Sequence, residues 1–157
     1  MKLTNATEQA VAIVAILATQ SHETLVSSET IYRKLSVSQS YIKKLLRKLV
    51  VAEIVSSVSG NSGGFQLNKA LHDISLYDVV KAIEGPFHSF PDIGVLKQAF
   101  AEFDEEAQNG HYVIANFFTQ ADESWKNSLA NISVADVFTE VFQGYETFPV
   151  HDWNLEH

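Results

Sequence analysis

The stretch SGNSGGFQL, residues 59–67, interrupts an otherwise apolar chain with three glycines among its first six residues. It matches neither glycine pattern that holds a nucleotide phosphate: a P-loop needs a lysine after its last glycine, and the Gly-x-Gly-x-x-Gly fingerprint is absent. Strand-like segments flank it at residues 53–58 and 65–68, the second with Phe65 and Leu67 in alternation. Because glycine reaches the positive φ angles of tight hairpins, the stretch predicts a β-hairpin turn.

Two predicted helices, residues 28–35 and 39–50, precede this hairpin and are joined by the polar turn SVSQS at residues 36–40. Apolar side chains of the second helix recur at i, i+3, i+4 and i+7 and form one stripe: Ile42, Leu45, Leu46 and Leu49. Basic side chains project away from the stripe: Lys43, Lys44, Arg47 and Lys48. No acidic residue occurs between Arg33 and Lys48, so the helix presents an uncompensated basic face.

An apolar helix at residues 7–19, with Asn5 and Glu8 at capping-box spacing, precedes this pair. Another helix starts at Ser75 after the hairpin and stops at residues 85–86, Gly-Pro. This order is that of a winged helix-turn-helix, whose second helix enters the DNA major groove while basic side chains and wing amides meet phosphates. The alternative is a merely solvated basic face. The wing at the right distance downstream favours DNA binding.

Charge divides the chain, whose net charge is −8. Residues 1–85 hold nine Lys/Arg and seven Asp/Glu, whereas residues 86–157 hold two and twelve. The asymmetry predicts a DNA-binding domain over residues 1–85 and a helical dimerisation or sensor region over residues 86–152. Residues 153–157 are expected to be a tail, because its last three residues, Leu-Glu-His, resemble the start of a cloned histidine tag.

The second half is predicted to be helical, which makes the fold class mainly α with a small β-hairpin wing. One of its helices carries an apolar, aromatic-rich stripe that a small domain leaves uncovered. An isologous homodimer would bury this stripe, which makes its residues candidates for dimerisation. They are Ile114, Phe117, Phe118, Ala121 and Trp125.

The absence of cysteine excludes disulfides, cysteine-ligated zinc or iron–sulfur clusters, and thiol catalysis. No catalytic constellation is visible, so an enzyme is not expected. The longest apolar run, residues 10–18, has nine residues, about half of a membrane span, and we expect a cytoplasmic protein without cofactor or metal. The histidines are scattered without metal-ligand spacing: His22, His72, His88, His111 and His151.

Five segments together resemble the Rrf2 family of bacterial winged-helix transcription regulators. They are MKLT at the start, SVSQSYIKKLLRKLV (36–50), GNSGGFQL (60–67), ISLYDVVKAIEGP (74–86) and LANISVADV (129–137). The resemblance implies a homodimer formed through a long helix at about residues 111–130, with DNA contacts from the helix pair and the wing. We expect these contacts from Ser28, Ser38, Gln39, Ser40, Tyr41, Lys43, Lys44, Arg47, Lys48, Ser59, Asn61, Gly63 and Gly64.

The chain departs from this family at two places. Many members hold an iron–sulfur cluster on three cysteines after Glu-Gly-Pro, whereas this chain has FHSFPDIGVLKQ there, with His88 and Asp92 as the remaining candidate ligands. Arginines that are frequent in the family are replaced by Glu8 and Ser59, which predicts weaker phosphate affinity.

The sequence therefore predicts a homodimeric, cluster-free transcription regulator, a repressor rather than an activator, that binds a pseudo-palindromic operator. The alternative is an effector- or protein-binding dimer whose specific DNA binding is weak or lost, as the acidic second half suggests. The signal stays open between a small-molecule effector bound near residues 87–95 and the dimer helices, a partner protein, and no signal at all.

Overall fold

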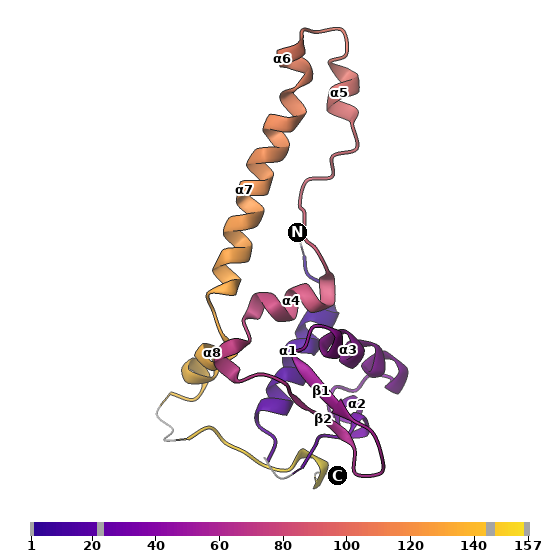
Figure 1. Cartoon of the computed structure of the whole chain (residues 1–157), viewed down its shortest axis with the longest axis vertical. Coiled ribbons are helices and arrows are strands. Elements are labelled where there is room, and N and C mark those ends of the chain that lie inside the picture. The colour runs from indigo at the N-terminus through magenta and orange to yellow at the C-terminus, as the bar shows by residue number, and fades with distance from the viewer. Residues whose placement is uncertain (1, 22–23, 144–146, 156–157) are drawn as a thin grey trace.

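The computed structural model of the chain describes residues 2–21, 24–143 and 147–155 (Figure 1). It is mainly helical with one small hairpin, as the sequence predicts. A body carries the hairpin and the C-terminus, and a long arm projects from it. The elements are α1 (Asn5–Ala18), α2 (Ser28–Lys34), α3 (Gln39–Val51), β1 (Val55–Val58), β2 (Gly64–Leu67), η1 (Leu71–Asp73), α4 (Leu76–Glu84), α5 (Val95–Ala99), α6 (Glu105–Gln108), α7 (Gly110–Ala130), α8 (Val134–Val141) and η2 (Trp153–Leu155).

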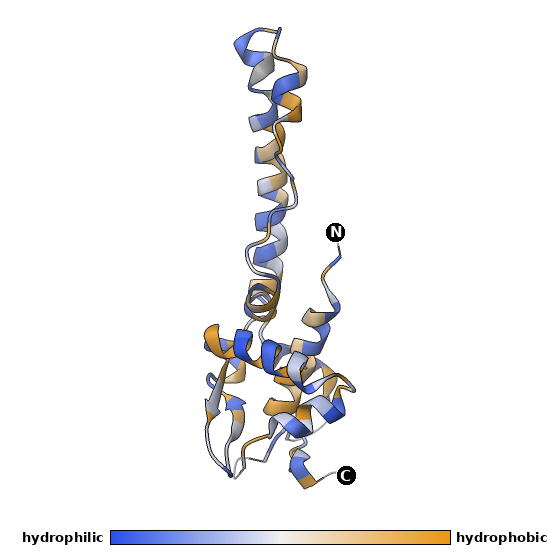
Figure 2. Cartoon of the chain, turned by 90° about the vertical axis from the view of Figure 1, so that its right-hand side faces the viewer, coloured by the Kyte–Doolittle hydropathy of each residue, from blue (hydrophilic) through white to orange (hydrophobic). Residues whose placement is uncertain are grey.

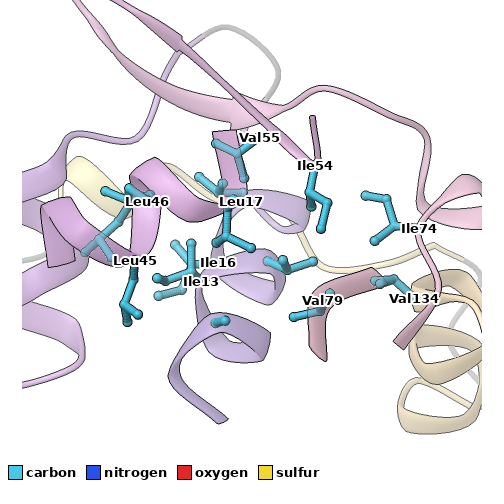
Figure 3. Packing of buried hydrophobic residues seen from close by; sticks show 14 of the residues in the cluster. Ile13, Ile16, Leu17, Leu45, Leu46, Ile54, Val55, Ile74, Val79 and Val134 are labelled. Carbon is cyan, nitrogen blue, oxygen red and sulfur yellow. The ribbon is translucent and has the colours of Figure 1, made fainter. Parts of the chain in front are cut away.

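The hydrophobic core lies where α1, α3, α4, α8 and the start of the hairpin meet (Figure 3). Helix α1 is apolar on several sides and buries residues such as Ile13 and Leu17, as its composition predicts. Helix α3 buries only the predicted stripe, which includes Leu45 and Leu46. Its other face is therefore left to solvent.

Ser75 and Asp78, and likewise Ser133 and Asp136, have the sequence spacing of a capping box, and both boxes form and lie side by side. At the start of α4, the Ser75 Oγ accepts a hydrogen bond from the Asp78 N–H (3.0 Å) while the Asp78 carboxylate accepts from the Ser75 N–H (2.9 Å). Ser133 and Asp136 repeat the arrangement at the start of α8, with 3.1 and 2.7 Å. Backbone hydrogen bonds of 2.9 and 2.8 Å join the two helix starts, so α8 is attached to the body.

This attachment differs from the division expected at residue 85. Val134 and Phe138 of α8 belong to the core cluster of the first domain. Residues 153–155, expected to be a tail, form η2, and the Trp153 N–H donates to the Gln20 side chain at 3.0 Å. The sequence pattern does not reveal either contact, because each joins segments far apart in the chain. That residues 1–85 bind DNA and residues 86–152 serve dimerisation or sensing stays a prediction.

The start of α1 is capped by a distant carboxylate and not by Asn5. Thr4 is the N-cap, and its own side chain makes no capping hydrogen bond. Instead, Glu84 Oε1 accepts from the Thr4 N–H (2.9 Å), the Thr4 hydroxyl (2.7 Å) and the Thr7 hydroxyl (2.5 Å). Partial burial raises the pKa of Glu84, but these hydrogen bonds outweigh it and hold the pKa below its ordinary value. The Glu-Gly-Pro end of α4 thus fixes the start of α1.

A Glu84→Gln variant is expected to lose about 1–2 kcal/mol of stability at pH 7, because hydrogen bonds to a charged group are stronger than those to an amide. The folded pKa of Glu84 lies below its unfolded value of about 4.3, so the stabilisation is complete above that pH and is lost as the pH falls through the folded value. Urea unfolding should therefore show a difference that shrinks towards acid pH. A difference independent of pH, or an equal effect from the exposed Glu106→Gln, would contradict this role.

The arm joins the body through an aromatic cluster. The Trp125 ring of α7 lies 5.2 Å from the Phe87 ring and 6.4 Å from the Tyr77 ring, centroid to centroid. Beside it, buried Asp122 accepts a hydrogen bond from the Ser89 N–H at 2.9 Å, and the hydrogen bonds from Ser89 lower the pKa of Asp122. These contacts fix residues 87–90 on α7.

Helix α7, with 21 residues, extends the arm by about 30 Å. Figure 2 shows apolar segments along the arm as well as in the body. Leu96, Ala99, Phe100 and Phe103 have the spacing of a single helix that would end at residues 109–110, but in the structure α5 ends at Ala99 and Phe103 lies between α5 and α6. None of the helices in the described ranges is both long and apolar enough to cross a membrane.

Candidate nucleic-acid interface

The solvent face of α3 gathers most of the predicted recognition residues. Ser38 is the N-cap, and its Oγ accepts from the Tyr41 N–H at 3.3 Å. The turn before it is tight, because Ser36 takes a left-handed conformation with φ of 53°. Tyr41 itself is half-buried against the core. The exposed side chains of this face are Ser38, Gln39, Ser40, Lys43, Lys44 and Arg47.

The positive charge of this face is not neutralised within the chain. Among the described residues, no acidic side chain forms an ion pair with Lys43, Lys44 or Arg47. By contrast, Arg33 on α2 pairs with Glu29 one turn earlier. An uncompensated basic helix face is what attraction to a phosphate backbone requires.

Lys48 leaves this face and turns towards α4. Its Nζ donates to the Ile83 carbonyl at 2.5 Å and lies near the Glu84 carboxylate. A cleft of about 630 Å³ opens beside it, between α3 and α4, lined in part by Lys44, Arg47, Lys48 and Lys81.

Lys81 is the basic residue that sequence reasoning missed. Its exposed position on α4 follows from the apolar stripe of that helix, which buries Val79, Val80 and Ile83. Its proximity to Lys44 depends on how α4 packs against α3, which no local pattern reports. The candidate interface is therefore wider than α3.

The glycine-rich stretch forms the predicted hairpin turn. Strands β1 and β2 pair antiparallel from Val55↔Leu67 to Val58↔Gly64. In the loop, Gly60 has φ of +116° and its carbonyl accepts from the Gly63 N–H at 3.0 Å.

The predicted wing contacts differ in accessibility. Ser59 and Asn61 are exposed in the loop, and Gly63 is half-buried. Gly64 is buried, and its backbone lies so close to Val26 that a Cβ would come within 2.6 Å of the Val26 carbonyl oxygen. Gly64 is therefore not part of the proposed contact surface. Ser28, at the start of α2, is half-buried.

A Gly63→Ala variant is expected to distort the wing and cost about 1–3 kcal/mol of stability. An added Cβ would lie 2.2 Å from the Val58 carbonyl oxygen and 2.9 Å from that of Gly60, and neither backbone atom has room to move. Chemical denaturation of Gly63→Ala and of the neighbouring, exposed Ser62→Ala measures the effect. Equal stability of the two variants would contradict the close backbone approach.

Most of the predicted dimerisation residues lie exposed on α7. The exposed fractions are 38% for Ile114, 65% for Phe117 and 43% for Phe118, whose ring stacks on Phe90 at 5.0 Å. Ala121 is also exposed. Trp125 differs, because it is half-buried in the aromatic cluster at the root of the arm.

Comparison with known proteins identifies a family. The family model Rrf2, described as an iron-dependent transcriptional regulator, matches residues 3–140. YwgB of Bacillus subtilis, named as an HTH-type transcriptional regulator, is 35% identical over 99% of this chain and 96% of its own length. YffB of Lactococcus lactis, named in the same way, is 35% identical over 98% of this chain and 97% of its own length.

Solved structures agree with this fold. CymR, the global cysteine regulator of Bacillus subtilis, superposes with a TM-score of 0.62 at 21% identity and covers 87% of this chain and 95% of its own. A transcriptional regulator from Lactobacillus plantarum has a TM-score of 0.66 at 22% identity, and the match covers 88% of this chain and 91% of that one.

The residues present do not fit an iron–sulfur cluster. The sequence has no cysteine, and the described residues contain no group of three side chains suited to a metal ion. His88 and Asp92 are both exposed. Aromatic contacts of Phe87 and Phe90 with α7 hold the segment that follows Glu-Gly-Pro.

Proposed function

This chain belongs to the Rrf2 family of transcriptional regulators, and on that premise we propose that it is a homodimeric, cluster-free DNA-binding repressor. The observation that carries the proposal is the exposed, unneutralised basic face of α3 beside the wing. Its close relatives are regulators of the helix-turn-helix type, which supports DNA as the partner. We propose that the exposed side chains of α3, with Ser59, Asn61 and Lys81, contact the DNA.

A homodimer through α7 follows from the exposed apolar side chains of that helix. Phe117 and Phe118 are 65% and 43% exposed in a single chain, and burying the exposed part against a second copy removes apolar surface from water. A two-fold axis then presents two α3 helices to successive half-sites about 34–36 Å apart. The operator is therefore expected to be pseudo-palindromic.

Repression is the simpler mode of action for such a dimer. A protein that occupies a promoter blocks transcription by exclusion, whereas activation needs a further surface that contacts the transcription machinery.

The second half of the chain is expected to lie away from the DNA. Residues 86–157 hold twelve acidic and two basic residues, so this half is repelled by the phosphate backbone.

The experiment that tests this function is selection of genomic fragments by the purified protein. Fragments retained at moderate salt are sequenced, and the proposal expects a shared two-fold symmetric motif, with the gene's own promoter among the candidates. Expression of a reporter behind this motif should rise when the gene is deleted. A chain that dimerises but enriches no motif would favour the alternative, an effector- or protein-binding dimer.

Iron analysis and a visible spectrum of protein purified without air test the absence of a cluster. We expect iron far below one equivalent per chain and no absorption band of a cluster. A stoichiometric band would contradict a cluster-free regulator.

A further inference from the structure

Residues 150–155, here called the C-terminal strap, lie across the loop between α1 and α2 and approach the wing (Figure 1). We propose that the strap is part of the DNA-reading apparatus: it holds α2 and the wing in register with α3, and Asn154 is its positioning residue. This inference rests on the DNA-binding function proposed above.

Asn154 fixes the start of α2 with hydrogen bonds that span more than 120 positions of sequence. Its Oδ1 accepts from the Ser27 N–H (3.0 Å) and the Thr30 hydroxyl (2.9 Å), and its Nδ2 donates to the Leu25 carbonyl (2.8 Å). Ser27 is at the same time the N-cap of α2, because its Oγ accepts from the Thr30 N–H at 3.0 Å. Ser27 and Thr30 are therefore held both by the N-cap of α2 and by Asn154 of the strap.

The strap also completes the hydrogen bonding of a buried amide. Gln20 is 6% exposed, and its Nε2 donates to the Asp152 carboxylate (2.9 Å) and to the Thr24 hydroxyl (2.6 Å). Its Oε1 accepts from the Trp153 N–H at 3.0 Å. Two of these three partners belong to the strap, and a buried amide without partners is unfavourable. The strap is thus built into the fold at this loop.

The other end of α2 meets the strap as well. The Lys34 Nζ lies 5.1 Å from the centroid of the Trp153 ring, within the range of a cation–π contact. The Trp153 Nε1 donates to the Thr19 hydroxyl at 3.0 Å. Helix α2 has seven residues, fully buries Ile31 and packs Tyr32 partly buried against the core, so the polar contacts of the strap add to a small apolar contact.

The same loop links the strap to the wing. Val26 and Phe65 exchange two backbone hydrogen bonds of 3.0 and 2.9 Å, which attach the loop to β2. Asn154, Arg33 of α2 and Asn61 of the wing line one open cleft of about 570 Å³. The strap therefore lies at the junction of α2 and the wing, beside the proposed DNA face.

An Asn154→Ala variant of the full chain tests the proposal. We expect operator affinity to fall at least about tenfold, while affinity for random DNA of equal length stays within about twofold, because nonspecific binding depends mainly on charge. For the same reason, the slope of log K against log salt should not change. Circular dichroism must show the variant folded at the assay temperature. Trp153→Phe gives a milder second test, because it keeps a ring over Lys34 and loses only the Nε1–H donor to Thr19. Its operator affinity should fall by less than that of Asn154→Ala.

Asn131→Ala is the matched control, because it makes the same exchange at an exposed side chain at the C-cap of α7, outside the strap. It should bind the operator as the wild type does. Unchanged operator affinity of folded Asn154→Ala would make the strap merely structural, tighter binding would make it a cover over the DNA face, and an equal loss of affinity for the operator and for random DNA would make Asn154 a backbone contact. Each of these results overturns the proposal. If the wild type does not prefer the operator to random DNA, the proposed function itself fails, and the strap proposal falls with it.

Discussion

Replacing Lys44 and Arg47 together by alanine is expected to weaken DNA binding about a hundredfold for each half-site, roughly tenfold per side chain, while the dimer stays intact. Both side chains are exposed on α3 and have no acidic partner among the described residues, so their charge is available to phosphates. Each phosphate contact contributes a slope of about −0.9 to log K against log salt. The double variant should therefore reduce the magnitude of the slope by about two for each chain of the dimer, or about four for the dimer on its full operator. Anisotropy titrations at several salt concentrations measure both quantities.

Lys97→Ala is the matched control, because it removes one positive charge from α5 on the arm, where the side chain is also exposed. It should bind DNA like the wild type, whereas Lys44→Ala alone should lose about tenfold. Equal losses for the two single variants would mean that net charge alone, and not the face of α3, governs binding. A double variant that binds DNA as tightly as the wild type would show that α3 is not part of the interface.

A Phe117→Glu variant is expected to separate the dimer. Phe117 is 65% exposed in a single chain, and a charge at this position would be buried without a partner in a contact between two α7 helices. Light scattering should give the 17.5 kDa of one chain, where the wild type gives twice that mass. Operator affinity should fall by a factor of about 100 or more, because the second half-site no longer binds as part of the same particle.

Val141→Glu is the control for this substitution, since Val141 is 66% exposed at the end of α8, which belongs to the body and not to the projecting arm. It should remain a dimer and bind the operator. A Phe117→Glu protein that still has the mass of two chains would show that the dimer contact does not depend on this residue.

The sequence predicts the local structure of this chain well, because caps and stripes report it directly. Helix α3 was expected at residues 39–50 and covers residues 39–51, and the helix expected at about residues 111–130 covers residues 110–130. The capping boxes at Ser75 and Ser133 are both present. Glycine spacing also predicts the wing, since its loop needs positive φ at Gly60.

Contacts between distant segments could not be predicted in this way. The start of α1 depends on Glu84, which lies 80 positions from Thr4, and the strap depends on Asn154, which lies 127 positions from Ser27. Periodicity and capping rules describe neighbours along the chain, so they do not report these contacts, and residues 153–155 of the strap were expected to be a tail because the last three residues of the chain resemble a tag. The same limit applies to Lys81, whose place beside α3 follows from helix packing alone.

Footprinting on a selected genomic fragment tests the central claim, a dimer that reads DNA with two copies of α3 and the wing. The expected result is a symmetric pair of protected patches whose centres lie about 34–36 Å, or a multiple of this distance, apart. Both patches should disappear with the Lys44→Ala/Arg47→Ala protein at the same concentration. A wild-type dimer that protects no sequence at low salt, or one that protects a single asymmetric patch, would contradict the claim.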